Sequence, residues 1–308
     1  MNRHIRFVYY TLKPIIPRPM QLLIRRWIAI YKRRKYEGIW PINNQARACP
    51  EHWHGWPEGK QFAFLLSHDV DTLKGYRNVL KLADFDEQMG FRSTFNFVPE
   101  RYGRISLELL KELKERGFGI GVHGLNHDGK LFYSKRIFAR KAIGINKYLK
   151  EWGTCGFTSP STHHNLAWMS ALNIDYATTT FDTDPFEPQP DHAKTIFPFL
   201  VENGIKLKEY VELPYTLPQD HLLFVILKEK KIDIWKRKID WIAQMGGMAL
   251  LNTHPDYIRF NGKKPNGEDY PIKYYGDFLQ YVKNRYSGIY HHTLASEISQ
   301  FWRMSSSK

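Results

Sequence analysis

The chain has 308 residues, of which 43% are hydrophobic and 25% charged, so it can bury a core of one large domain or two ordinary ones. This composition excludes a chain that is disordered throughout. The formal net charge of +14 is uneven, because residues 1–36 carry ten Lys or Arg residues and no acid, which leaves +4 for the rest. No nucleic-acid-binding motif accompanies this basic segment, so we expect no nucleic-acid partner.

The basic segment divides at KPIIPRP, whose prolines prevent a continuous helix. Residues 20–31 then predict an amphipathic helix with an apolar stripe of Leu23, Trp27, Ile30 and Tyr31. Residues 1–36 could therefore contact an anionic membrane surface, or the helix could pack on the main domain. Both alternatives stay open at this point.

The chain shows no sign of crossing or leaving a membrane. No run approaches the roughly 18 apolar residues of a spanning helix. The basic start lacks an uninterrupted apolar stretch and a small-residue cleavage site, so a secretory signal is not expected. With only Cys49 and Cys155, a reduced compartment is the simpler interpretation. We expect a cytoplasmic protein, with the basic segment as a candidate contact to the inner membrane face.

Residues 37–60 predict an irregular lead-in, and strands alternate with helices from residue 61 onward. The predicted strands cover 62–69, 92–98, 118–123, 155–161, 175–181, 210–216 and 248–254. The predicted helices cover 75–90, 105–117, 134–153, 233–247 and 271–288. This alternation favours an α/β fold with parallel strands, as a barrel or an open sheet. We expect an extension over 1–60 and one domain over 61–308.

Two acidic residues close the first predicted strand, in the sequence SHDVD. Asp69 and Asp71 are two residues apart, so both can point to one side of extended backbone. Two carboxylates so placed repel each other unless a cation or a shared proton relieves them. A loop-capping role for one of them is the alternative.

Two histidines close the third predicted strand, in the sequence HGLNH. On a helical turn, His123 and His127 would lie about 5–6 Å apart at Cβ and could bind one ion. Imidazole nitrogen and carboxylate oxygen suit zinc and other divalent metals. With Asp71 they make a candidate facial triad that leaves positions open for water and substrate. His254, after a late strand in NTHPD, is a candidate general acid or a structural residue.

The order SHDVD, HGLNH, an SPS loop, DTD and NTHPD resembles the polysaccharide deacetylases of carbohydrate esterase family 4. The resemblance covers about residues 61–260. It looks closest to a subgroup with HDVD in place of Phe-Asp-Asp, associated with surface polysaccharide or lipopolysaccharide synthesis. It implies a distorted (β/α) barrel of the NodB-homology type and an N-acetylated sugar or glycan as substrate.

The resemblance also implies roles for single residues. Asp71, His123 and His127 would hold a divalent metal, zinc first, with cobalt, nickel or manganese as alternatives. Asp69 would be the general base, and His254 the general acid. A backbone N–H in the loop of Ser161 would help to hold the oxyanion.

The sequence departs from the family pattern at three places. Val70 separates the two carboxylates, so the roles of Asp69 and Asp71 could be exchanged. Thr158 stands where the family has an arginine that orients the base. The segment FDTDPF lacks the tryptophan that follows this motif in the family. Its two acidic residues are therefore expected to bind the substrate or another charged group. The predicted substrate-binding residues are Asp182, Asp184, Phe97, Phe186 and Tyr215, with Trp168 a further aromatic candidate for the sugar groove. An aromatic residue in such a position is more often a core residue, which is the alternative for each of them.

Two alternative functions remain. Relatives of this fold also cleave C–N bonds in small nonsugar amides or cyclic imides, which would need a small closed pocket. A catalytically silent glycan-binding protein is the other alternative, and Thr158 is its only support.

Overall fold

The computed structural model describes residues 16–51, 53–187, 189, 191–202, 209–260 and 264–306. The first described element is helix α2 (Arg18–Lys35), which extends the predicted helix at both ends. It begins directly after Pro17 and has Pro19 in its first turn, where a missing N–H costs no hydrogen bond. The first 15 residues of the basic segment lie outside the described residues. No described helix combines the length and the hydropathy needed to cross a lipid bilayer.

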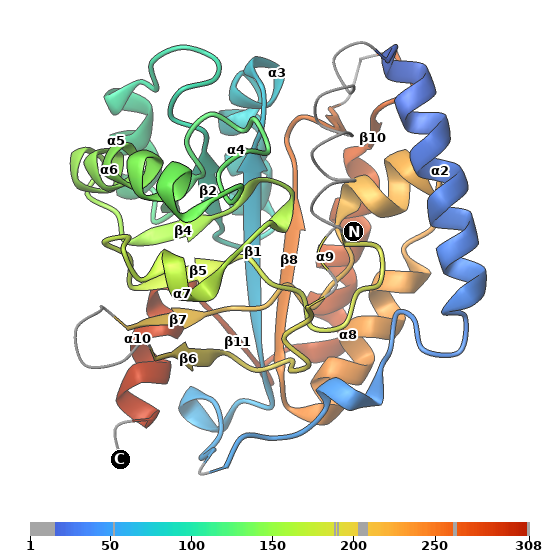
Figure 1. The fold of residues 1–308 in the computed structure, drawn as a ribbon. Coiled ribbons are helices and arrows are strands. Elements are labelled where there is room, and N and C mark those ends of the chain that lie inside the picture. The colour runs from blue at the N-terminus through green and yellow to red at the C-terminus, as the bar shows by residue number, and fades with distance from the viewer. Residues whose placement is uncertain are drawn as a thin grey trace.

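The centre of the molecule is a curled sheet whose main strands are all parallel (Figure 1). Strand β1 (Phe62–Val70) is buried along its whole length, as a continuous apolar run predicts for a central parallel strand. It pairs with β2 on one side and with β8 on the other. The order of the main strands is β8, β1, β2 (Thr94–Phe97), β3 (Gly119–His123), β4 (Gly156–Thr158), β5 (Tyr176–Thr178) and β7 (Tyr210–Glu212), with β8 spanning Met248–Thr253.

The sheet closes between β7 and β8 without a regular ladder among the described residues. The Thr216 hydroxyl donates to the Met248 carbonyl (2.8 Å) and accepts from the Leu250 amide (2.9 Å), and Leu217 N–H donates to the Leu250 carbonyl (3.2 Å). These bonds make the sheet a distorted barrel and decide against the open-sheet alternative. Two edge strands add to it: β11 (Tyr290–His292), parallel to β1, and β6 (Phe199–Val201), antiparallel to β7.

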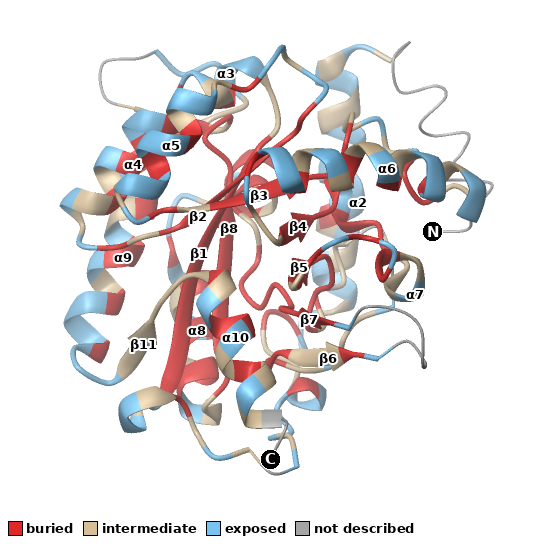
Figure 2. Cartoon of the chain, turned by 90° about the vertical axis from the view of Figure 1, so that its left-hand side faces the viewer, coloured by how far each residue is buried: buried red, intermediate tan, exposed pale blue. Residues whose placement is uncertain are grey.

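Amphipathic helices cover the outside of the barrel (Figure 2). In α5 (Leu107–Glu115), for example, Leu110 and Leu113 are buried and the Ser106 hydroxyl caps the first turn. The others are α3 (Leu73–Tyr76), α4 (Val79–Gln88), α6 (Lys135–Glu151), α7 (Leu166–Met169), α8 (Asp233–Met245), α9 (Ile272–Tyr286) and α10 (Ala295–Ser306).

The predicted alternation of strands and helices is confirmed, with one helix corrected and several short elements missed. The helix expected at 75–90 is split into α3 and α4 at Arg77 and Asn78, and the side-chain amide of buried Asn78 donates to the Pro255 carbonyl (3.1 Å). The missed elements are β6, β9 (Ile258–Arg259), β10 (Tyr270–Pro271), β11, α7, α10, the π-helix η5 (His221–Ile226) and the 3₁₀ turns η1 (Asn44–Ala46), η2 (Pro57–Gly59) and η3 (Pro160–Thr162).

Candidate metal centre and acid–base site

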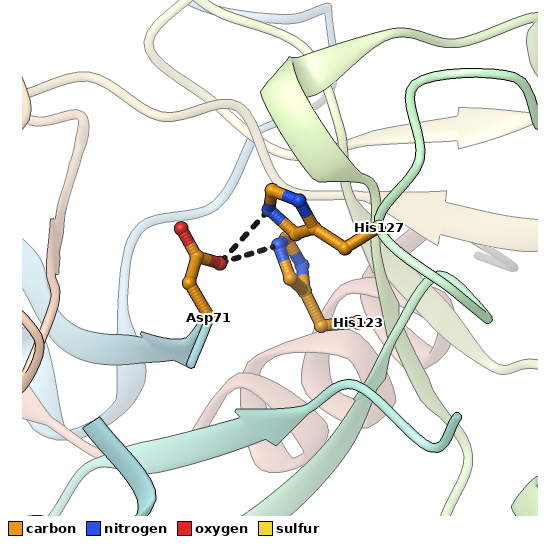
Figure 3. Close-up of side chains that lie close together, drawn as sticks. All are labelled: Asp71, His123 and His127. Atoms are coloured by element: carbon orange, nitrogen blue, oxygen red, sulfur yellow. Dashed lines mark ion pairs between the residues drawn. The ribbon is translucent and has the colours of Figure 1, made fainter. Parts of the chain in front are cut away.

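Asp71, His123 and His127 meet at the carboxyl ends of β1 and β3 (Figure 3). Asp71 Oδ1 lies 3.3 Å from His123 Nε2 and 3.0 Å from His127 Nε2. One ligand atom from each residue falls within 4.8 Å of the others, and this is the only such group of His, Cys, Asp or Glu side chains among the described residues. The carboxyl ends of parallel strands are where barrels gather their active sites.

The two histidines are not on a helical turn, so that expectation is wrong. Residues 124–127 form a bend in which Gly124 has φ +64° and His127 has φ +54°. A Cβ on Gly124 would lie 2.7 Å from Pro160 Cδ, so the position requires glycine. Positive φ is uncommon for a residue other than glycine and is often found at functional sites. The bend brings the imidazole rings to 5.3 Å between centroids.

The Asp71 carboxylate has the character of a cation ligand. Its Oδ1 is buried and makes no hydrogen bond with any described residue. Burial opposes ionisation, but His127 and His123 hold the pKa of Asp71 well below its ordinary value. A buried carboxylate oxygen facing two imidazole nitrogens is a donor set that fits zinc or another divalent metal.

Thr158 orients one of the candidate ligands. It pairs with His123 in the register of β3 and β4, and its Oγ1 lies 2.6 Å from His123 Nδ1. With Nδ1–H as the donor, Nε2 is left as the nitrogen that faces Asp71. The Thr158 hydroxyl then donates to Asp69 Oδ1 at 3.4 Å. The residue in place of the family arginine thus connects a candidate ligand to the candidate base.

Asp69 is buried and is held by two neutral amides instead of an arginine. Asn96 Nδ2 donates to Asp69 Oδ1 and Asn252 Nδ2 donates to Asp69 Oδ2, both at 2.9 Å. Asn96 comes from β2 and Asn252 from β8, the two strands that flank β1. Sequence reasoning missed both asparagines, although Asn252 belongs to NTHPD and Asn96 is the polar residue of the strand TFNF.

His254 is paired with a carboxylate that the sequence analysis did not identify. Its Nδ1 lies 2.7 Å from Asp220 Oδ1, and its backbone N–H donates to Asp220 Oδ2 (2.8 Å). The Tyr270 hydroxyl also donates to Asp220 Oδ2 (2.9 Å). Burial disfavours the charged imidazole, but Asp220 outweighs this and raises the pKa of His254 to about 10. The charges of Asp71 and Asp69 act in the same direction, so His254 belongs to the same site.

A further carboxylate fixes the backbone of Asp71. Asp256 Oδ2 accepts from Asp71 N–H (3.0 Å), and its Oδ1 accepts from the Thr72 hydroxyl (2.5 Å). A Cβ on Gly75 would lie 2.2 Å from Asp256 Oδ2, so this approach depends on glycine. Asp256 is the last residue of NTHPD, a position to which sequence reasoning gave no role.

The other predicted polar residues lie in varied surroundings. Ser161 is exposed in a loop where it and Thr162 both have positive φ, +56° and +50°. Asp182 is buried in an ion pair with Lys238 Nζ (2.5 Å). Asp184 is buried and accepts from Phe186 N–H (3.0 Å), and burial raises its pKa to about 6. The alternative that Asp182 binds another charge therefore agrees with its contact to Lys238.

The predicted aromatic residues differ in access. Phe97 has no exposed surface and packs in the core with Trp152, so nothing in this structure supports its contact with a sugar. Tyr215 is 1% exposed, and its hydroxyl lies 3.1 Å from the Thr178 hydroxyl. Phe186 is half-buried and meets Trp40 edge-on. Trp168 is likewise half-buried.

No protein-family model matches the chain. No curated protein matches it either. Among solved structures, it is similar to a candidate polysaccharide deacetylase from Mycobacterium smegmatis, with 17% identity and a TM-score of 0.59 over 84% of this chain and 95% of that one. This likeness shows that the two share the fold, a curled parallel barrel.

Two other solved structures are similar at lower scores. The peptidoglycan deacetylase PdaC from Bacillus subtilis is 11% identical with a TM-score of 0.46, over 80% of this chain and 95% of that one. A family 4 acetyl xylan esterase from Clostridium thermocellum, in complex with a cobalt ion, is 12% identical with a TM-score of 0.45, over 78% of this chain and 91% of that one.

Proposed function

We propose that the protein is a metal-dependent hydrolase that removes an N-acetyl group from a sugar, in the synthesis of surface polysaccharide or lipopolysaccharide. The observation that carries the proposal is the convergence of three parts at one end of the barrel. These are the Asp71–His123–His127 group, the amide-held carboxylate of Asp69 and the His254–Asp220 pair. Metal-dependent amide hydrolysis needs metal ligands, a general base and a general acid within reach of one carbonyl group. The resemblance to the HDVD subgroup of the polysaccharide deacetylases supports this choice of reaction.

Asp71, His123 and His127 would hold the metal, with zinc as the first choice and cobalt, nickel or manganese as alternatives. When bound, a divalent cation supplies polarisation of the amide carbonyl and a lower pKa of water. Thr158 and Asp256 position this set, since they contact His123 Nδ1 and Asp71 N–H.

Asp69 would take the proton from the attacking water. Its Oδ1 accepts from Asn96 and from the Thr158 hydroxyl, whereas its Oδ2 accepts one hydrogen bond, from Asn252, and retains a lone pair for the water. Protonated His254 would give its proton to the departing sugar amine, and Asp220 would stabilise the charged imidazole. Backbone N–H in the loop of Ser161 would stabilise the developing oxyanion.

The environment of Thr158 weakens the case for a catalytically silent glycan-binding protein. The missing arginine was the only support for that alternative. Asn96 and Asn252 hold Asp69 in its place, and Thr158 itself contacts both Asp69 and His123. This arrangement favours an active enzyme.

The direct test is acetate release from a panel of N-acetylated sugars, free, nucleotide-linked and lipid-linked, with added zinc. We expect release of acetate from at least one sugar. The variants Asp71→Ala, His123→Ala and His127→Ala should lose both acetate release and the bound metal. His54→Ala removes an exposed histidine and serves as the matched control. Full metal occupancy in any of the three variants would contradict the ligand assignment. Activity confined to small nonsugar amides would favour the second hydrolase alternative.

We also propose that the protein is cytoplasmic and contacts the anionic inner membrane through residues 1–36. The outward face of α2 supports this, because Trp27 is 74%, Tyr31 67% and Leu23 56% exposed. Arg26, Arg33 and other basic residues flank this apolar face. An amphipathic helix with aromatic and basic side chains is suited to the interface of an anionic bilayer.

Vesicle sedimentation tests this contact. Trp27→Ser should weaken binding to vesicles that contain an anionic phospholipid. Ile143→Ser removes a 73% exposed apolar side chain on α6 and should leave binding unchanged. Equal binding by wild-type protein and Trp27→Ser would exclude α2 as the membrane contact.

A further inference from the structure

The inward face of α2 carries three basic residues at intervals of seven: Arg18, Arg25 and Lys32. Seven residues turn a helix by about 700°, within about 20° of two full turns, so the three lie on one stripe. The outer two are anchored to the domain. Arg18 Nε donates to Glu268 (2.9 Å), and Lys32 Nζ donates to the Pro185 carbonyl (2.7 Å). The stripe therefore runs along the domain surface.

Arg25, the middle member, has no acceptor in the part of the chain that the structure describes. It is half-buried and makes no hydrogen bond or ion pair with any described residue. Its charge influences Glu187, whose Oε2 accepts a hydrogen bond from the Thr162 hydroxyl (2.8 Å). Burial and Asp184 raise the pKa of Glu187 to about 8, which opposes its ionisation near neutral pH. The guanidinium of Arg25 thus has no anionic hydrogen-bond partner among the described residues.

Helix α2, which carries Arg25, packs against η5, the element that contains His221. The charge of Arg25 acts on Tyr257 and on His221, whose rings are 4.7 Å apart. The Tyr257 ring lies 5.3 Å from that of His254, and the charge of Asp71 also acts on Tyr257. The rings of His221, Tyr257 and His254 therefore form a continuous row that leads from η5 to the catalytic centre. Figure 1 shows α2 along the outside of the barrel.

His221 adds an unused polar atom to this region. It is 8% exposed, and its Nε2 has no hydrogen-bond partner among the described residues. Burial, together with Arg25, keeps the pKa of His221 well below its ordinary value. A neutral imidazole can donate or accept one hydrogen bond at this atom. Beside an arginine that has no anionic hydrogen-bond partner among the described residues, such an atom indicates a polar ligand.

We propose that Arg25, between the anchored Arg18 and Lys32, binds the phosphate of a sugar carried as a glycosyl phosphate or diphosphate. This inference rests on the proposed function in that the same bound sugar would present its amide to the metal centre. A guanidinium binds phosphate oxygens through two parallel hydrogen bonds, which an ammonium group cannot do. A half-buried arginine beside an aromatic wall is screened less by water than a surface lysine. The substrate class is therefore a phosphate-linked amino sugar.

A binding measurement separates this inference from the proposed activity. The probe is glucose 1-phosphate, which carries no amide, titrated calorimetrically into the full-length, zinc-loaded protein with glucose as reference. We expect glucose 1-phosphate to bind more tightly than glucose, and Arg25→Ala and Arg25→Gln to weaken its binding about 10- to 100-fold, the usual effect of one charge-assisted hydrogen bond. Arg26→Ala, which removes an exposed charge from the next residue, should bind as wild type. Equal binding of the sugar and its phosphate, or no loss in both Arg25 variants, would overturn the inference.

A second arm identifies the carrier. Acetate release is compared for one N-acetylated sugar as the free sugar, the 1-phosphate, the nucleotide diphosphate and the polyprenyl phosphate. We expect a higher kcat/KM for at least one phosphate-linked form, and a loss of about 10- to 100-fold for that form in Arg25→Gln. A preference for the free sugar would overturn the inference while leaving the deacetylase proposal intact. No release from any form would instead count against the deacetylase proposal, and the calorimetric result would still decide the phosphate site.

Discussion

The side chains of Asp69 and Asp71 lie on the same side of β1, but the groups around each carboxylate suit it to a different chemical role. Asp69 accepts two amide hydrogen bonds, which fix its direction without supplying a charge. Asp71 faces two imidazole nitrogens and has a buried oxygen without a hydrogen bond among the described residues. This contrast supports Asp71 as the ligand and Asp69 as the base, rather than the exchanged roles that the inserted Val70 allows.

Asp69→Asn should retain the metal and lose turnover. An amide of the same shape cannot accept the proton of water, and a general base contributes about 10²- to 10⁴-fold to the rate. Metal content by mass spectrometry and acetate release measure the two effects. Asp277→Asn, on the exposed side of α9, is the control. Turnover within tenfold of wild type in Asp69→Asn would show that Asp69 is not the base.

The His254–Asp220 pair predicts a pH dependence. Because Asp220 raises the pKa of His254 to about 10, the acid keeps its proton through neutral pH, and kcat/KM should fall only as the pH rises through that value. Asp220→Asn removes the charge, lowers the pKa of His254 and should move this alkaline limb to lower pH. Tyr270→Phe keeps the charge of Asp220 and should leave the limb in place. An unchanged limb in Asp220→Asn would exclude His254 as the group that sets it.

The sequence predicted five of the residues that meet in the site, Asp69, Asp71, His123, His127 and His254, because each lies in a short motif at the end of a strand. It could not predict Asn96, Asn252 or Asp220. Their roles depend on which strands are neighbours and on the register between them, and a single asparagine or aspartate carries no local signal of either.

At the scale of elements, His68 connects β1 to its surroundings. It is the second residue of the SHDVD motif, and its side chain points to the opposite face of the strand from those of its two neighbours in the chain. His68 Nδ1 lies 2.8 Å from the Thr253 hydroxyl, and its Nε2 lies 2.9 Å from Asp86 Oδ2. Ser93 and Tyr275 also donate to Asp86 (2.7 and 2.9 Å). One buried network thus joins β1 to β8, α4 and α9 beneath the candidate site.

His68→Ala should lower the free energy of unfolding by about 3 kcal/mol, because it leaves the buried Asp86 with a lost hydrogen bond and opens a cavity. Urea denaturation measures this change. His54→Ala, at an exposed position, should stay within about 0.5 kcal/mol of wild type. A loss below 1 kcal/mol in His68→Ala would mean that the network relaxes around the missing side chain.

The elements that sequence analysis predicted are those with a strong apolar period, such as β1, α5 and α8. The elements that it missed are short or irregular. Strand β11 has three residues, and it exists because it adds to the edge of β1. The bend after β3 depends on contact between Gly124 and Pro160, which a local pattern does not reveal.

For the whole molecule, the candidate metal ligands come from segments that only the native fold brings together. Asp71 and His127 are far apart in the chain, so a cation should bind the folded state and not the unfolded one. Zinc at about 100 times its dissociation constant should then add about 2.7 kcal/mol of stability. Calorimetry should show a rise in Tm of roughly 5 °C, reversed by a chelator and absent in His127→Ala. A similar rise in His127→Ala would place the stabilising zinc elsewhere.

The irregular closure between β7 and β8 bears on the acid half of the site. Asp220 follows four residues after Thr216, and His254 follows four residues after Leu250, so the pair sits directly above this junction. The Leu250 amide proton is held by a side-chain hydroxyl instead of a strand ladder, and we expect it to exchange with deuterium sooner than the amides between β1 and β2. Local opening at this junction would separate Asp220 from His254 while the metal ligands, on β1 and after β3, stay together. Faster exchange at Leu250 would therefore divide the barrel into a more rigid part that carries the ligands and a junction at which the proton donor can be released from its partner.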